Sequence, residues 1–316
     1  MSGMVSGPAL DPEMLQLPEA ISRSRRVSAN SVIGLIGLAI VVGLALMAIF
    51  ADQLSPYDPI ERVARPFLRP SGDHLLGTND IGQDLVSELI HGARISLTVG
   101  VVAALVSLLI GTTVGLLAGF YPRRLGRVLM RGVDIILVLP FLPLLIILAA
   151  YLGRSLLTTI IVIGVLSWAG AARVIRSQVL SLTERDYVLA ARSMGASDRH
   201  IMVRHVLPRV LLIAIGVFVQ ATSGAILLEA ALSFLGLGDP TQKSWGTMLY
   251  WAQVRGAFLT PAWLWWVLPP GLFIASSALG FALLGFSLEQ RINPRLRQGR
   301  GTFRALNHAP FDRRIC

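Results

Sequence analysis

Six long apolar segments dominate this chain and constrain its fold more than any other feature. Each approaches the roughly 20 residues that an α-helix needs to cross the hydrocarbon core of a bilayer. The sequence is 54% hydrophobic and only 15% charged, whereas about a quarter of the residues in soluble domains are charged. We therefore expect an all-α membrane protein with six transmembrane helices. The predicted spans cover about 31–51, 95–120, 133–152, 155–172, 207–236 and 263–287.

The basic residues between the spans indicate an orientation in the membrane. When the N-terminus is placed inside the cell, 21 of the 28 Lys and Arg residues fall on the cytoplasmic side. Short basic loops next to spans tend to stay in the cytoplasm, so we expect both termini there. The predicted regions are an N-terminal tail (1–30), a first transmembrane helix (31–51), an external loop (52–94), a core transmembrane domain (95–290) and a C-terminal tail (291–316).

Small residues and prolines mark particular positions inside the spans. Three glycines recur every four residues in the second span, which predicts a close packing face between spans or between subunits. Prolines in the third and sixth spans should kink those helices, as expected of a gated pathway. These residues are Gly111, Gly115 and Gly119, then Pro140 and Pro143, then Pro269 and Pro270.

A long polar interval, residues 181–208, separates two strongly apolar segments in the second half of the chain. Ser181 with Glu184, or Thr183 with Asp186, offers a capping box that can start a helix. Because the Lys and Arg count places this interval on the cytoplasmic side, its helices should touch something outside the bilayer.

The rest of this interval has the pattern of two short helices. Residues 187–194 favour helix, and Gly195 can adopt the left-handed conformation that ends one. Ser197 can cap a second helix that runs through Arg204. Pro208 prevents that helix from continuing without a kink.

The two predicted external loops differ from the cytoplasmic ones. The first is rich in proline and acidic residues, and an amphipathic helix starting near Asp84 should run into the second span. The second, residues 237–262, contains Trp245 and Trp251, and tryptophans in such loops commonly lie at lipid headgroups.

Several kinds of chemistry are not supported by the sequence. A phosphate-binding loop needs a Gly-Lys pair, and the only lysine, Lys243, follows a glutamine. His200 and His205 are five residues apart and should not share a helix face, so we expect no metal site. No catalytic residues are predicted, and the sole cysteine, Cys316, can form no intrachain disulfide. The basic balance follows membrane orientation, so nucleic acid is not an expected partner.

Two acidic residues near or inside spans are further candidates, because charges within the membrane are costly. Asp134 begins the third span, and its simplest interpretation is an ion pair with Arg131. Glu229 lies deep in the fifth apolar run. It can contact substrate, or bind a backbone group or an arginine near the external mouth.

At this point the motifs resemble a known family, the permease subunits of ATP-binding cassette importers of the dipeptide/oligopeptide/nickel group. The signature E-A-A-x-x-x-G, followed after about nine residues by I-x-L-P, is similar to Leu189-Ala190-Ala191 with Gly195 and then residues 205–208. The segment LGTNDIGQD before the second span resembles L-G-T-D-x-x-G-R-D. EAALSFLGLG, followed by Ser-Trp-Gly, also matches this group. The order of features points to the second permease of a pair.

The chain departs from these motifs at several positions. Leu189 stands in place of the signature glutamate, Gln83 in place of an arginine, and His205 in place of the isoleucine.

The resemblance implies a type I importer permease fold and roles for particular residues. The helices in 181–206 would be coupling helices that dock on an ATP-hydrolysing subunit, with Ala191 and Gly195 at close-contact positions. The implied coupling residues are Tyr187, Leu189, Ala190, Ala191, Gly195, Ala196, Leu207 and Pro208. The candidates for the pathway or its external mouth are Glu229, Ser233, Trp245 and Gly246.

The resemblance also implies the partners: a second permease subunit, two ATP-binding subunits that hold ATP and Mg, and an external solute-binding protein. The chain itself would bind no cofactor and would span a bacterial or archaeal plasma membrane. A secondary transporter or channel with a regulatory loop remains an alternative, and so does a structural scaffold, although the motifs argue against it. The sequence leaves the substrate open among dipeptides, oligopeptides, nickel and other small solutes.

Overall fold

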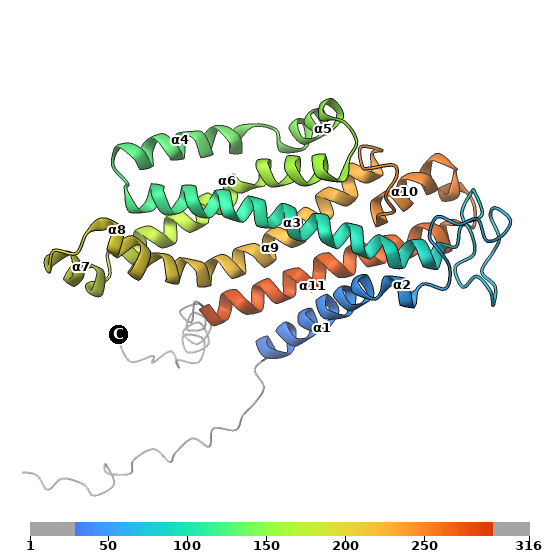
Figure 1. Ribbon diagram of the computed structural model, residues 1–316, viewed down its shortest axis with the longest axis horizontal. Helices are drawn as coiled ribbons and strands as arrows, with labels where there is room; N and C mark the ends of the chain where they lie inside the picture. Colours follow the sequence, from blue (N-terminus) through green and yellow to red (C-terminus); the bar gives the residue numbers. More distant parts are fainter. Residues whose placement is uncertain (1–28, 293–316) are drawn as a thin grey trace, which may run out of the picture.

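A computed structural model describes residues 29–292 of the protein, and its regular elements there are helices (Figure 1). The predicted tails, with Cys316, lie outside the described residues apart from the first two residues of α1 and the last two residues of α11. The α-helices are α1 (Ala29–Ile49), α2 (Ala51–Leu54), α3 (Leu85–Phe120), α4 (Arg124–Val138), α5 (Phe141–Leu152), α6 (Leu156–Thr183), α7 (Asp186–Ser193), α8 (Asp198–Ile201), α9 (Leu207–Phe234), α10 (Trp245–Val254) and α11 (Leu268–Ile292). Two π-helical turns, η2 (Met202–Val206) and η4 (Trp263–Val267), and the 3₁₀ turn η3 (Ala257–Leu259) complete them.

Within the described residues, five helices are long and apolar enough to cross a membrane, and the bent pair α4–α5 makes a sixth candidate. This confirms the all-α membrane fold. Three boundaries differ clearly from the prediction. The helix α3 begins at Leu85 rather than near residue 95, α4 begins at Arg124 rather than near 133, and α6 continues to Thr183 rather than ending near 172. The start of α3 matches the predicted amphipathic helix, since Asp84 caps it by accepting from the backbone N–H of Ser87 at 2.8 Å.

The third predicted span is broken rather than simply kinked. Its two halves, α4 and α5, meet at 86°. Leu139 is extended, as expected for a residue that precedes proline, and Pro140 then forms the N-cap of α5. In the sixth span, Pro269 and Pro270 lie just after the π-helical turn η4, and Trp263 to Gln290 remains a single candidate span.

The glycine repeat of α3 lies against α6. A methyl group built on Gly115 would lie 2.6 Å from the carbonyl oxygen of Ala172, and one on Gly111 would lie 2.8 Å from that of Trp168. A methyl group built on Gly119 would lie 2.7 Å from the β-carbon of Val179. These separations leave no room for a side chain, so the predicted packing face is confirmed, between two spans of one chain.

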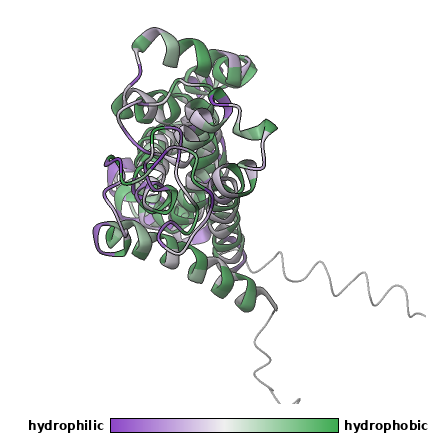
Figure 2. Cartoon of the chain, turned by 90° about the vertical axis from the view of Figure 1, so that its right-hand side faces the viewer, coloured by the Kyte–Doolittle hydropathy of each residue, from purple (hydrophilic) through white to green (hydrophobic). Residues whose placement is uncertain are grey.

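The helices form an elongated bundle with two distinct ends (Figure 1). At one end, called here the α7 end, lie α7 and α8. At the opposite end, the α10 end, lie α2, residues 55–84 and α10. Hydrophobic residues make up much of the helical bundle (Figure 2). Apolar side chains on its outside include Leu35, Ile147 and Leu157, which are each more than 60% exposed. Such a surface suits a lipid environment.

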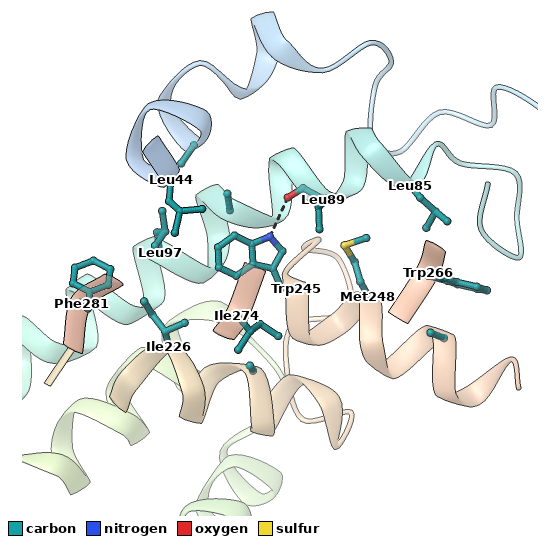
Figure 3. Packing of buried hydrophobic residues seen from close by; sticks show 14 of the residues in the cluster. Leu44, Leu85, Leu89, Leu97, Ile226, Trp245, Met248, Trp266, Ile274 and Phe281 are labelled. Carbon is teal, nitrogen blue, oxygen red and sulfur yellow. Dashed lines mark hydrogen bonds between the residues drawn. The ribbon is translucent and has the colours of Figure 1, made fainter. Parts of the chain in front are cut away.

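The core near the α10 end is built around Trp245, which is fully buried (Figure 3). Its indole N–H donates to the carbonyl oxygen of Leu89 at 3.0 Å. Side chains from α1, α3, α9, α10 and α11 surround it, among them Leu44, Leu97, Ile226, Met248 and Phe281. The short helix α10 is therefore wedged into the bundle rather than resting on its surface.

Candidate functional site

The helices α7 and α8 with the residues between them, 186–201, are called here the α7–α8 tip, and this tip begins differently from the prediction. Thr183 is the last residue of α6, and α7 starts at Asp186 after Arg185, whose side chain makes no capping hydrogen bond. Both proposed capping boxes are therefore wrong, because Ser181 and Thr183 belong to the preceding helix. Two residues, Glu184 and Arg185, separate α6 from α7.

The end of α7 agrees with the prediction. Gly195 is left-handed, with φ of +82°. The N–H of Ala196 donates to the carbonyl of Ala191 at 3.1 Å, and the N–H of Gly195 donates to that of Arg192 at 3.0 Å, which closes the helix. Ser197 then caps α8 by accepting from the N–H of His200 at 3.3 Å.

The second short helix does not stop at Pro208. The π-helical turn η2 connects α8 directly to α9, and Pro208 lies in the first turn of α9, where its missing N–H costs little. This geometry also corrects the expectation for the two histidines. The rings of His200 and His205 lie 5.7 Å apart, because a π-helical turn brings residues five apart onto one face.

The inner face of the tip packs on the ends of the long helices. Val188, Ile201 and Val206 are fully buried against Ile175 and Val179 of α6, in a cluster that also takes in the ends of α3 and α9. Motion of the tip would therefore displace the ends of three candidate spans.

The predicted coupling residues fall on both faces of the tip. Leu189 and Ala190 are exposed, as is the neighbouring Met194 at 82%. Ala191 is only 6% exposed and faces the interior of its own chain, so its side chain supports the tip and is not placed to contact another subunit. The remaining residues divide similarly: Gly195 and Pro208 are exposed, while Tyr187, Ala196 and Leu207 are half-buried.

Tyr187 links the tip to the start of α9. The guanidinium carbon of Arg209 lies 4.5 Å from the centre of its ring, a cation–π contact. The Tyr187 hydroxyl is buried and has no hydrogen-bond partner among the described residues.

A large cavity runs between α3, α6, α9 and α11. Its volume is about 980 Å³. The walls combine small residues with hydroxyl and amide groups, including Ser177, Gln178 and Gln220. Its charged lining residues in the described chain are Arg185, Arg209 and Glu289, all at the α7 end. Sequence reasoning missed this set, although Gln220 within an otherwise apolar predicted span was a signal.

The four predicted pathway residues lie outside this cavity, towards the α10 end. Glu229 is 2% exposed, and its carboxylate accepts from the hydroxyls of Ser96 at 2.9 Å and Ser233 at 2.8 Å. No arginine pairs with it in the described structure. Trp245 and Gly246 are buried; a methyl group on Gly246 would lie 2.7 Å from the carbonyl oxygen of Ala230. These residues therefore join α3, α9 and α10 by packing and hydrogen bonds.

Two further acidic residues make contacts that the sequence did not indicate. Asp134 pairs with Arg173 of α6 at 2.6 Å, rather than with Arg131 on its own helix. Asp239, after α9, accepts from Thr241 and from the backbone N–H of Leu156 at 3.3 Å. Burial acts to raise the pKa of Asp239, but these hydrogen bonds outweigh it and hold the pKa below the ordinary value.

The described residues contain no group of three or more His, Cys, Asp or Glu side chains that could hold a metal ion. The exposed tip, the cavity and the polar contacts at the α10 end are thus the features available for function.

Comparison with known proteins places these features in a family. Residues 111–298 match the model of the binding-protein-dependent transport system inner membrane component, and residues 29–70 match the N-terminal transmembrane domain of oligopeptide transport permease C. The chain is 40% identical to the di/tripeptide transport system permease protein DppC of Pseudomonas aeruginosa, over 94% of this chain and 99% of that protein. It is 36% identical to the oligopeptide transport system permease protein OppC of Bacillus subtilis, over 84% and 87% of the two chains.

A third relative, the dipeptide transport system permease protein DppC of Bacillus subtilis, is 35% identical over 87% of this chain and 85% of its own length. The family model alone covers more than half of the sequence, and these relatives align with 84% to 94% of it. The motifs near Gly195 and Trp245 lie within the matched region. The chain therefore belongs to the family of binding-protein-dependent transport system inner membrane components, multi-pass permease subunits of ATP-binding cassette importers.

Proposed function

We propose that this chain is one of two permease subunits of a peptide importer in a prokaryotic plasma membrane. The second permease completes the path, two ATP-binding subunits hold ATP and Mg and hydrolyse the nucleotide, and an external binding protein delivers the peptide. The chain supplies the path and the mechanical coupling and has no catalytic residues of its own.

One observation carries this proposal: the tip and the cavity share residues. Arg185 lines the cavity and is also the N-cap of α7, and Arg209 lines the cavity while its guanidinium stacks on Tyr187 of α7. A partner subunit that moves the tip therefore moves one rim of the cavity directly. If residues 181–208 were only a regulatory loop of a secondary transporter or channel, the loop and the cavity would not need to share Arg185 and Arg209.

The cavity wall also supports a second permease subunit as a neighbour. Ser177 and Gln220 are exposed on membrane-spanning helices, where polar groups facing lipid are costly. A partner subunit covering this side would remove them from lipid and enclose a hydrated path between the two chains.

The chemistry of the wall supports a peptide as the substrate. Hydroxyl and amide groups donate to and accept from peptide bonds, and the wall presents both kinds without a fixed charge away from the α7 end. The printed names of the relatives describe di/tripeptide, oligopeptide and dipeptide permeases, which supports the same substrate class. A nickel path would be expected to offer several convergent His, Cys or carboxylate ligands, whereas the wall in the described chain has one carboxylate, that of Glu289.

We place the α7 end in the cytoplasm and the α10 end outside. The arginines that precede and open α4 lie at the α7 end, as the preference of basic residues for the cytoplasm requires (Figure 1). In this orientation α7 and α8 meet the ATP-binding subunits, and the α10 end receives the binding protein.

Reconstitution tests the proposal. The permease pair, with its ATP-binding subunits in liposomes, should take up a labelled dipeptide only when ATP is enclosed and the loaded binding protein is outside. Uptake should persist when a protonophore dissipates the proton gradient. A secondary transporter would show the opposite dependence, with uptake lost to the protonophore and unaffected by ATP.

A further inference from the structure

The contact between the two external loops is built on a buried ion pair. Glu88, in the first turn of α3, is 2% exposed. The ammonium group of Lys243, which lies two residues before α10, donates to its carboxylate at 2.6 Å. The side chain of Lys243 is itself only 20% exposed. A buried carboxylate needs such a partner, because an unpaired charge in the interior is strongly destabilising.

Two amides complete this contact. Lys243 also donates to the side-chain oxygen of Gln83 at 2.7 Å. The amide nitrogen of Asn79 donates both to Gln83 and to Glu88, each at 2.9 Å. Gln83 in turn donates to the carbonyl oxygen of Ile60, deep in the first loop, at 2.7 Å. The network therefore connects three parts of the first external loop to a single residue of the second.

The other end of α10 is attached to the same loop. Arg255, the C-cap of α10, pairs with Asp80 at 2.8 Å. Lys243 and Arg255 are the only basic residues of the second external loop, and both pair with acidic residues between positions 80 and 88. Between them lies Trp245, whose burial against α3 closes the bundle at this end.

We infer that Lys243 and Glu88 form a clamp that fastens α10 to the start of α3, so that the two external loops act as one rigid cap. Lys243 is a positioning residue in this cap. The clamp also accounts for a departure from the family motif, in which an arginine stands at the position of Gln83. Lys243 instead brings a cation to Gln83 and Glu88 from the other loop.

The existence of the clamp can be tested by chemical labelling, because the chain has a single lysine. The complete complex is treated with an amine-reactive ester, and the modification of Lys243 is followed by peptide mass mapping. Lys243 should react slowly in the wild type and at least tenfold faster in Glu88→Gln. Glu61→Gln, an exposed acidic residue of the same loop, is the matched control and should leave the rate unchanged. Equal rates in wild type and Glu88→Gln would overturn the clamp.

Charge rearrangement provides a second readout that does not depend on a single variant folding well. Glu88→Lys and Lys243→Glu should each lower the amount of assembled complex at least fivefold, and the double exchange should restore at least half of it. The double variant Gln83→Arg with Lys243→Gln should also give more assembled complex than Lys243→Gln alone. Failure of both rescues would overturn the pairing.

The role of the cap rests on the proposed function and is tested separately. In reconstituted uptake, Lys243→Gln should raise the apparent KM for the loaded binding protein at least fivefold, because a loosened cap docks it less well. The maximal rate per assembled complex should stay within twofold, and Lys243→Arg should restore the KM. Unchanged KM in a variant with a broken clamp would refute the docking role. Absence of any uptake in the wild type would refute the proposed function while leaving the labelling result intact.

Discussion

Gly195 offers a direct test of how the coupling tip is built. Its φ of +82° is a conformation that side chains other than glycine rarely adopt. A β-carbon placed there would meet nothing within 4 Å, so within this chain a substitution acts only through the backbone. Forcing an ordinary residue into the left-handed region costs about 1–2 kcal/mol. Asparagine tolerates this region better, and a β-branched residue tolerates it worse.

These costs predict a graded series. A loss of about 1–2 kcal/mol lowers the ratio of correctly formed to altered tips by roughly 5- to 30-fold. We therefore expect ATP-driven uptake in Gly195→Asn within about twofold of the wild type, a severalfold loss in Gly195→Ala, and near-background uptake in Gly195→Val. Membrane insertion should be equal in all three, measured by the amount of protein in the membrane fraction.

The series separates two explanations for the glycine. If position 195 must lack a side chain because a partner subunit contacts it closely, asparagine should abolish uptake as completely as valine does. That result would refute the backbone argument. Wild-type uptake by Gly195→Val would instead refute the role of the tip as a rigid lever.

Three further predictions concern stability and pH. Gly115→Ala should lower the free energy of unfolding by about 1–3 kcal/mol by overpacking the α3–α6 contact, whereas Gly43→Ala, with nothing within 4 Å, should be neutral or stabilising; equal melting temperatures for the two would contradict the packing argument. Glu229→Gln should cost about 1 kcal/mol and leave uptake nearly unchanged, while Glu229→Leu strands the Ser96 and Ser233 hydroxyls and should cost about 2–4 kcal/mol in thermal unfolding; a loss of uptake in the stable Gln variant would indicate a direct role in transport. The lowered pKa of Asp239 stabilises the fold above its unfolded value of about 3.9, and this stabilisation is lost as pH falls through the lower folded pKa. The melting temperature should thus fall less between pH 5 and pH 3 in Asp239→Asn than in the wild type, and identical slopes would contradict this.

The sequence alone predicted the fold through features that are local. Span-length apolar runs, the glycine spacing of α3 and the left-handed Gly195 depend on a few neighbouring residues, and the structure confirms them. A kink at Pro140 was expected, but a break of 86° was not, because proline disrupts helix hydrogen bonding without setting the direction of the next helix.

Features that depend on distant residues could not be predicted in the same way. The partner of Asp134 is Arg173, 39 positions away, and Lys243 reaches Glu88 across 155 positions. Ala191 was expected to face a partner, yet its side chain packs against its own chain, because the orientation of α7 is set by the apolar cluster beneath it. The cavity required four helices to be placed together before its polar residues could be recognised as one wall.

The central claim is that the exposed face of the α7–α8 tip contacts an ATP-hydrolysing subunit. A photoreactive group attached to Leu189→Cys, in a chain whose single Cys316 has been replaced by serine, tests this contact in the assembled complex. We expect a crosslink to an ATP-binding subunit whose yield changes when ATP is trapped, and no such crosslink from Val165→Cys, an exposed position on the middle of α6. Crosslinking of Leu189→Cys to lipid or to the other permease alone would contradict the account.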